Sequence, residues 1–317
     1  MDQQTIQIIN RVLPILLLLF LGYWFRRTQF FSEGFMDGLR KLVINVALPA
    51  VLFLSFLQID LKPSFIVLSV VIFLLNIALY LIGRFLGPRV APNHPYFPFL
   101  MTGFEYGMLA ISLFGSAYGL AQIGVIAVTD LGHELFIWFV FLPLLLAKRD
   151  GIQRPADLLQ SFLKSPVVIA ILASLLLNLL GIGDSLFSWP ITGGIMATLR
   201  FLADLTIPLI LLTVGYGIKL DRQGFSSASR VVLIRLAIII PLILIMNRLL
   251  IDTLLQLGSP YEVALFTLFI MPPPFIIPLF MRQDLVEERR YVNNVLMLHT
   301  IVSITLFVLF FIFNPTL

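Results

Sequence analysis

The sequence lacks cysteine altogether, which excludes disulfides, thiol chemistry and cysteine-ligated metal centres. It also lacks the phosphate-binding motif GxxxxGK(S/T), so we do not expect this chain to couple directly to ATP. The segment HELFI (133–137) departs from the zinc motif HExxH, because Ile137 stands where the second histidine would be. No DDxxD or GxSG signature is present either, so we expect no enzyme, no cofactor and no metal.

Charged residues are scarce as well, at 12% of the chain, whereas hydrophobic residues make up 59% and the mean hydropathy is +1.02. No soluble core requires so much apolar surface, so we predict an all-α polytopic membrane protein. The net charge of +4 comes from scattered basic residues, which gives no sign of a nucleic-acid partner. The first apolar run has no basic segment before it and no cleavage site after it, which predicts a retained span rather than a signal peptide.

Apolar windows of about 20 residues, the length that crosses a bilayer, occur ten times along the chain. They lie near 6–25, 38–57, 64–86, 96–118, 122–147, 164–182, 192–217, 229–251, 261–281 and 291–313. With both termini outside, nearly all loop arginines and lysines fall on the cytoplasmic side, and only Lys62 and Arg248 fall outside. This bias predicts an integral protein of a bacterial plasma membrane, whose longest connection, 148–163, is a cytoplasmic linker.

The two halves of the chain resemble each other. A shift of 159 residues aligns 39–61 with 199–220, and a shift of 166 aligns the fourth and fifth windows with the ninth and tenth. Each half, 1–147 or 164–317, holds five windows, so the halves must run in opposite senses across the membrane. Inverted repeats of this kind build secondary transporters, with the site near the midplane where interrupted helices meet. The alternative is that leucine-rich helices align by chance.

The ninth window contains four prolines in a stretch that otherwise resembles a membrane helix. Non-helical backbone at membrane depth is tolerated only where it lines a cavity or is buried in protein. We therefore predict two half-helices that cross a similar break in the glycine-containing fourth window; a kinked packing helix is the alternative. The helix ends would offer their dipoles to a solute. The predicted substrate contacts are Glu105, Tyr106, Gly107, Ser112, Asn45, Pro273, Pro274 and Pro278.

Ionisable residues inside the predicted spans are functional candidates, because a charge in the hydrocarbon is costly. Glu105 lies at the predicted break, where it would exchange protons or, alternatively, bond freed backbone amides and lock the crossing. The repeat aligns His133 with His299, and both are candidates for a proton relay, a coupling-cation site or a packing network. Arg235 lies close enough to a span end to snorkel. The predicted coupling residues, for H⁺ or Na⁺, are Glu105, Asp130, His133, Glu134 and His299.

Seven segments of the sequence resemble the auxin efflux carrier family, a branch of the bile/arsenite/riboflavin transporter superfamily. They are LGYWFRR (21–27), LRKLVINVALPAVLF (39–53), TDLGHELFIW (129–138), SPVVIAILASLLLNLLGI (165–182), LADLTIPLILLTVGYGIKL (202–220), MPPPFIIPLFM (271–281) and LHTIVSIT (298–305). The resemblance implies a bile acid:sodium symporter-like fold of ten spans, with broken, crossed fourth and ninth spans. It implies a scaffold of spans one, two, six and seven, and a transport domain of spans three to five and eight to ten. Elevator-type movement and a homodimer through the scaffold are implied as well.

Members of that family carry auxin or small organic anions, including dicarboxylates. The fourth span departs from the family pattern, because Glu105 stands near the usual asparagine and Ser112 at the position of the crossover proline. The family's usual substrate and coupling chemistry is therefore not transferred to these two positions. We expect a secondary active transporter of a small organic solute, an auxin-like or carboxylate anion, that works by alternating access. The alternative is a membrane ligand sensor that uses the same cavity without net transport.

Overall fold

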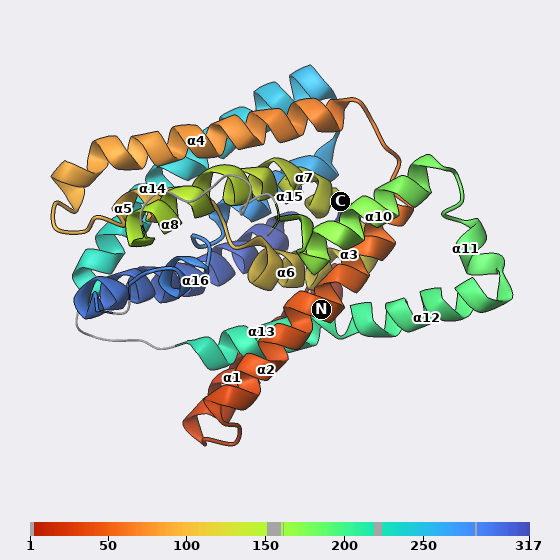
Figure 1. The fold of residues 1–317 in the computed structure, drawn as a ribbon, viewed down its shortest axis with the longest axis horizontal. Coiled ribbons are helices and arrows are strands. Elements are labelled where there is room, and N and C mark those ends of the chain that lie inside the picture. Colours follow the sequence, from red (N-terminus) through yellow and green to blue (C-terminus); the bar gives the residue numbers. More distant parts are fainter. Residues whose placement is uncertain (1–2, 151–159, 161, 219–223, 283) are drawn as a thin grey trace.

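The computed structural model describes residues 3–150, 160, 162–218, 224–282 and 284–317, and every regular element within them is a helix (Figure 1). Seven stretches are long and apolar enough to cross a membrane, so the chain is a helical integral membrane protein. They are Ile9–Arg27, Glu33–Leu57, Ser64–Val90, Leu120–Arg149, Pro190–Gly217, Phe225–Leu255 and Val286–Phe313. Most of the predicted linker 148–163 lies outside the described residues.

The described chain contains long helices, short helices and tight helical turns in alternation. The first half holds α1 (Gln3–Arg27), α2 (Glu33–Leu42), η1 (Val43–Ala47), α3 (Leu48–Leu57), α4 (Ser64–Val90), α5 (Phe97–Leu100), η2 (Tyr106–Ala110), α6 (Ile111–Tyr118), η3 (Leu120–Gln122), α7 (Ile123–Phe136), η4 (Ile137–Phe141) and α8 (Leu142–Asp150). The second half holds α10 (Pro166–Leu179), α11 (Ser185–Ser188), α12 (Pro190–Asp204), α13 (Thr206–Gly217), α14 (Phe225–Met246), η5 (Asn247–Leu255), α15 (Ser259–Ile270), η6 (Ile277–Leu279) and α16 (Val286–Phe313).

Three of the ten predicted windows hold helices that are shorter than a full span. α10 has 14 residues and α15 has 12, and the window 96–118 is divided between α5 and the later pair η2 and α6. A helix rises about 1.5 Å per residue, so 14 residues reach roughly 21 Å of a hydrocarbon layer about 30 Å thick. α10 begins at Pro166 and ends before Gly181, whose φ of 68° does not continue a helix. The ten-span count therefore remains a prediction.

α1 packs along α13 with the two backbones in contact. A Cβ atom on Gly22 would lie 2.1 Å from the carbonyl oxygen of Leu212, and one on Gly215 would lie 2.1 Å from that of Leu19. Small residues at helix interfaces allow such close approach, which is the usual basis of helix association in membranes. Glycine is thus required on both helices.

Other helix pairs also pack closely, and α7 joins them because it contacts both α3 and α15. α3 packs on α10 and α12, α4 packs on α7, and α14 packs on α15 and α16. Figure 1 shows α4 along one long edge of the molecule and α12 and α13 end to end nearer the opposite edge. Buried apolar side chains form two large clusters. The first contains Phe104 and Ile270, and the second contains Leu100 and Ile277. The chain therefore passes from one cluster to the other between Leu100 and Phe104, and again between Ile270 and Ile277.

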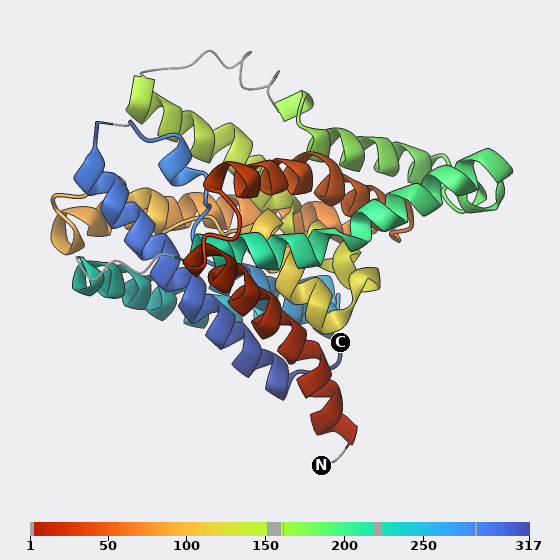
Figure 2. The same ribbon diagram turned by 90° about the horizontal axis from the view of Figure 1, so that it is seen from below.

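Two contacts place the chain ends relative to α16. Arg11 donates a hydrogen bond to the carbonyl oxygen of Pro315 at 3.3 Å, beyond the end of α16, and Figure 2 shows both chain ends on that side. Lys148 lies 5.4 Å from the ring centroid of Tyr96, whose amide donates to Glu288 at the beginning of α16. Lys148 and the chain ends therefore lie near opposite ends of α16.

Candidate functional site

The first helix break separates α5 from η2 and α6. Gly103 has φ of 66°, a left-handed conformation that favours glycine, and Glu105 is extended, with φ −83° and ψ 91°. A Cβ atom on Gly103 would lie 2.8 Å from the ring of Pro274, so another side chain would not fit. The helix restarts after Glu105, whose Oε1 accepts the N–H of Met108 at 3.1 Å as an N-cap.

The second break follows α15. The helix ends at Ile270, Met271 is extended, and the prolines at 272–274 have no amide to donate. Helical structure returns only as the short 3-10 turn η6, which contains Pro278. The interruption predicted from the prolines is therefore present, and it leaves an extended segment buried in the protein.

The two breaks meet at Glu105. Its backbone N–H donates to the carbonyl oxygen of Pro272 at 2.8 Å. Its Oε2 accepts the N–H of Phe275 at 2.7 Å, while Oε1 accepts that of Met108. One carboxyl group therefore binds an amide on each of the two interrupted segments.

Every amide from residue 103 to residue 105 has a partner from a different part of the chain. The acceptors are Asn76 Oδ1 on α4, His133 Nε2 on α7 and the carbonyl oxygen of Pro272, at 3.1, 3.1 and 2.8 Å. Buried backbone amides without partners are rare, because each costs the free energy of a lost hydrogen bond. The first break is thus held in place from three sides.

Arg235, on α14, binds the carbonyl ends of both broken helices. Its side chain is fully buried, and its guanidinium donates to Leu100 O at 2.9 Å, to Gly103 O, and to Met271 O at 3.4 Å. Leu100 ends α5 and Met271 follows α15, so the cation lies where the helix dipoles are negative. Among the described residues no carboxylate pairs with it. The prediction that Arg235 snorkels to a span end is therefore wrong.

Glu105 and Arg235 together bind the backbone groups that interrupted helices expose. The carboxyl group lies at amide ends and the guanidinium at carbonyl ends, which is the favourable placement of each charge. The sequence had predicted that these ends hold a solute directly. In the structure they are bonded to the chain's own side chains, so an anion at the crossing would have to displace the Glu105 carboxyl.

Asp130 and His133 form a buried pair beside the crossing. His133 Nδ1 lies 2.8 Å from Asp130 Oδ1, and its Nε2 accepts the N–H of Phe104 at 3.1 Å. Because Nε2 accepts a hydrogen bond, the ring proton belongs on Nδ1, from which it is donated to Asp130. The Phe104 ring stacks on the imidazole, with centroids 3.7 Å apart. These two predicted coupling residues therefore help to hold the first break.

His299 has a matching place at the second break. Its Nδ1 lies 2.9 Å from the hydroxyl of Ser303, which donates in turn to the carbonyl oxygen of Ile270 at 2.6 Å. Because the hydroxyl proton goes to Ile270, His299 Nδ1–H is the donor to Ser303. Its Nε2 is buried and has no hydrogen-bond partner within the described chain. Each histidine of the aligned pair thus supports one of the two breaks.

Three predicted site residues have partners away from the crossing. Ser112, on α6, is buried and donates to the carbonyl oxygen of Leu109 in the preceding turn η2 at 2.8 Å. Asn45 is exposed and donates to a carbonyl oxygen one turn earlier. Glu134 accepts the indole N–H of Trp138 at 2.8 Å and so does not join the pair formed by the histidine next to it. None of the three hydrogen bonds reaches either break.

The remaining predicted residues lie at the breaks themselves. Tyr106 and Gly107 open the helix that follows Glu105, and the Tyr106 hydroxyl is buried without a partner in the described part of the chain. Pro273 and Pro274 are buried in the second break. Proline side chains have no hydrogen-bonding groups, so these two residues shape the crossing and do not hydrogen-bond a solute through their side chains.

No group of three or more His, Asp or Glu side chains in the described ranges is placed to hold a metal ion. Comparisons with protein-family models and with curated protein sequences gave no match. Among the described residues, the ionisable groups at the crossing are the carboxyls of Glu105 and Asp130, the guanidinium of Arg235 and the two histidines, each bonded to backbone or to a neighbouring polar side chain.

Proposed function

We propose that the chain is a secondary active transporter of a small organic solute, with an organic anion as the favoured class. The observation that carries this proposal is the meeting of two interrupted helices inside the protein, with Glu105 and Arg235 bonded to both. Interrupted helices at membrane depth are characteristic of transporter sites, where they line the path of a solute. The two side chains stabilise a crossing that would otherwise leave buried amides and carbonyls unpaired.

The finer architecture belongs to the same proposal. Ten spans would form two inverted halves, 1–147 and 164–317, like those of auxin efflux carriers and bile acid:sodium symporters. The packing of α3 on α10 and α12, and of α1 on α13, supports a scaffold of predicted spans one, two, six and seven. The packing of α14 on α15 and α16 supports a separate transport domain. A homodimer through the scaffold, elevator-type movement and a bacterial plasma membrane complete the proposal.

We assign coupling to the crossing. Protonation of Glu105 would remove the charge to which both amides donate and would loosen the crossing. The Asp130–His133 pair lies beside the first break and His299 beside the second, and these three residues are further candidates for coupling. Protons are favoured over Na⁺, because Arg235 already binds carbonyl oxygens of the kind that coordinate Na⁺ in other transporters.

Uptake of organic acids into proteoliposomes tests this function. An imposed inward proton gradient should drive accumulation by the wild type, and the rate should not change when Na⁺ is removed. Glu105→Gln should abolish the pH dependence, whereas Glu134→Gln should preserve it because Glu134 is bonded to Trp138 instead. If Glu105→Gln retained both uptake and its pH dependence, the coupling assignment would be wrong.

A ligand sensor is the second candidate function. It is favoured by one observation, namely that the ends of both broken helices are bonded internally and do not require a solute to be stable. Saturable binding of an organic acid without flux, in vesicles that hold a stable gradient, would support the sensor and contradict the carrier.

A further inference from the structure

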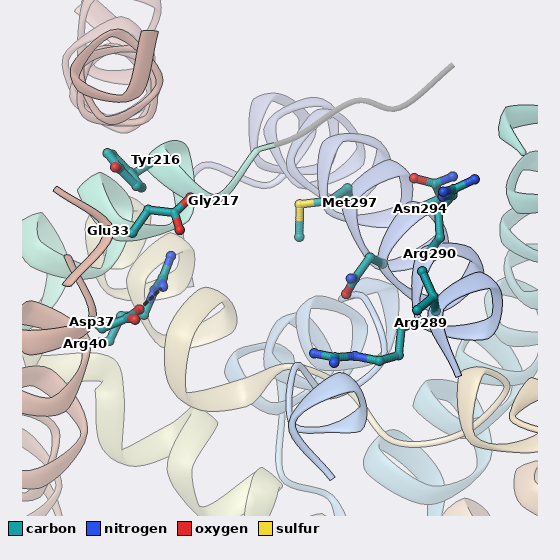
Figure 3. Close-up of a pocket in the computed structure, with 11 residues that line it drawn as sticks. Glu33, Asp37, Arg40, Tyr216, Gly217, Arg289, Arg290, Asn294 and Met297 are labelled. Atoms are coloured by element: carbon teal, nitrogen blue, oxygen red, sulfur yellow. Dashed lines mark hydrogen bonds and ion pairs between the residues drawn. The ribbon is translucent and has the colours of Figure 1, made fainter. Parts of the chain in front are cut away.

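Two helices direct polar side chains into one cavity. On α2, Glu33, Asp37 and Arg40 follow one another at intervals of four and three residues, and on α16 the interval of four recurs from Arg289 to Met297. These intervals bring side chains to one face of a helix. Figure 3 shows the side chains of α2 and those of α16 on opposite sides of the cavity.

The cavity has a volume of about 560 Å³, within the range of roughly 300–1,000 Å³ that is typical of small-molecule sites. Tyr216 and Gly217, at the end of α13, complete the wall formed by α2. The cavity therefore lies between helices assigned above to the scaffold and a helix assigned to the transport domain. A solute carried by the transport domain past the scaffold would pass through a cavity between the two domains.

Among the described residues, Arg289 is the cation in this cavity whose side chain has no partner. Arg40 is bonded to Asp37 at 2.6 Å, and Arg290 lies 3.4 Å from Glu287. Arg289 is half-buried and, within the described residues, its guanidinium has neither a hydrogen bond nor an ion pair. In Figure 3 its guanidinium extends toward the open space. A half-buried guanidinium offers several N–H donors in a planar fork, which matches a carboxylate.

The opposite wall limits what such a ligand can be. Glu33 is acidic and Asp37 is bonded to Arg40 at 2.6 Å, so the described residues of this wall offer no unpaired cation to a second carboxylate on the ligand. Met297 offers apolar surface on the same helix as Arg289, and Tyr216 offers aromatic surface on the wall across from it (Figure 3). Among the described residues, the cavity thus has the Arg289 guanidinium on one wall with Met297 on the same helix, and the Tyr216 ring, Glu33 and the Asp37–Arg40 pair on the other.

We propose that this cavity binds a small monocarboxylate with an apolar body. The carboxylate bonds to the Arg289 guanidinium, with the Asn293 amide one turn further along α16 as a second donor. The apolar body lies against Tyr216 and Met297. This inference deepens the proposed function, since it names the class of anion and places its binding away from the crossing, where Glu105 already binds the amides.

Ligand-induced thermal stabilisation of the purified protein in detergent tests the site. The probes are benzoate, phenylacetate and hexanoate, each compared with its uncharged amide, and benzylamine as a cation. At least one carboxylate should bind the wild type with higher affinity than its amide. Arg289→Gln should weaken that binding about tenfold or more, the loss expected for a charge-assisted pair. The matched control is Arg282→Gln, an exposed arginine paired with Asp284, which should bind like the wild type.

Asn293→Asp supplies a second variant in case Arg289→Gln does not fold. It preserves size and adds a negative charge beside Arg289, so it should abolish carboxylate binding and leave amide binding unchanged. The proposal is overturned if no carboxylate binds better than its amide, if Arg289→Gln binds as the wild type does, or if benzylamine is the preferred ligand. Carboxylate binding without flux in proteoliposomes would instead leave this site standing and contradict the carrier.

Discussion

Among single residues, Glu105 is the one on which both helix breaks converge. Its carboxyl accepts the amides of Met108 and Phe275, at 3.1 and 2.7 Å, and its own amide donates to Pro272. Each of the two side-chain bonds uses one carboxyl oxygen, so both oxygens must be acceptors. Removal of one acceptor leaves a buried amide without a partner, which costs about 1–3 kcal/mol.

Glu105→Gln should therefore lower the free energy of unfolding by about 1–3 kcal/mol, because the new amide group places N–H donors opposite a backbone N–H. Unfolding followed by circular dichroism in detergent measures the change. Glu134→Gln is the control, since glutamine can still accept the indole N–H of Trp138. An equal loss in the two variants would contradict the role of Glu105 in joining the breaks.

Arg235→Ala should destabilise the protein more strongly, by more than about 3 kcal/mol. The substitution removes bonds to Leu100, Gly103 and Met271 together and leaves buried carbonyl oxygens unpaired. The same unfolding assay measures the loss. Guanidinium ion at low, non-denaturing concentration should restore part of it in the alanine variant and none in the wild type. A variant as stable as the wild type would show that the guanidinium does not hold the crossing.

The sequence pointed to only one of these two residues. Glu105 stands out as a carboxyl in an apolar window, beside glycines that permit a break. Arg235 was missed as a site residue because its partners are backbone carbonyls, which leave no mark in a side-chain pattern. Its one visible signal was an arginine inside a predicted span. Asn45 was predicted to contact the substrate, yet it is exposed and donates to the carbonyl oxygen of Lys41, one turn earlier.

At the level of elements, apolar length predicted the long helices well and the interrupted ones poorly. A hydropathy window counts apolar side chains whether or not the backbone is helical. MPPPFIIPLFM (271–281) passes that count, but three consecutive prolines cannot donate the bonds of a helix. The location of this break was therefore predictable, because it depends on local residues. The partners that hold it were not, because they come from distant parts of the chain.

The close packing of α1 on α13 gives a prediction about glycine. Gly215→Ala should weaken the protein, since the added Cβ would lie 2.1 Å from the carbonyl oxygen of Leu19 and force the helices apart. Gly194→Ala, in α12, has no atom within 4 Å of the new Cβ and should be neutral or stabilising by up to about 1 kcal/mol. Melting temperatures of the two variants measure the difference. Equal temperatures would contradict the backbone contact.

In the whole molecule, the crossing joins two buried clusters, a polar cavity lies beside the start of α16, and the chain ends lie beyond its other end. This arrangement predicts which parts of the surface face each side of a membrane. From the positive-inside bias we expect the α16 start and the cavity to face the cytoplasm.

The absence of native cysteine makes that assignment directly measurable. Lys148→Cys and Thr316→Cys each introduce one exposed thiol, at opposite ends of the molecule. A membrane-impermeant maleimide added to intact cells should label Thr316→Cys and leave Lys148→Cys unlabelled until the membrane is opened. Labelling of both thiols from outside would contradict the topology.

Electron density for residues 97–118 and 259–281, obtained from the protein in a lipid nanodisc, tests most directly whether two interrupted helices cross inside the protein. We expect two extended segments in contact, the Glu105 carboxyl between the amides of both, and the Arg235 guanidinium against the carbonyls that end α5 and α15. A continuous helix through residues 264–281, or a charged Arg235 side chain that faces lipid, would contradict the crossing and the transport function proposed from it.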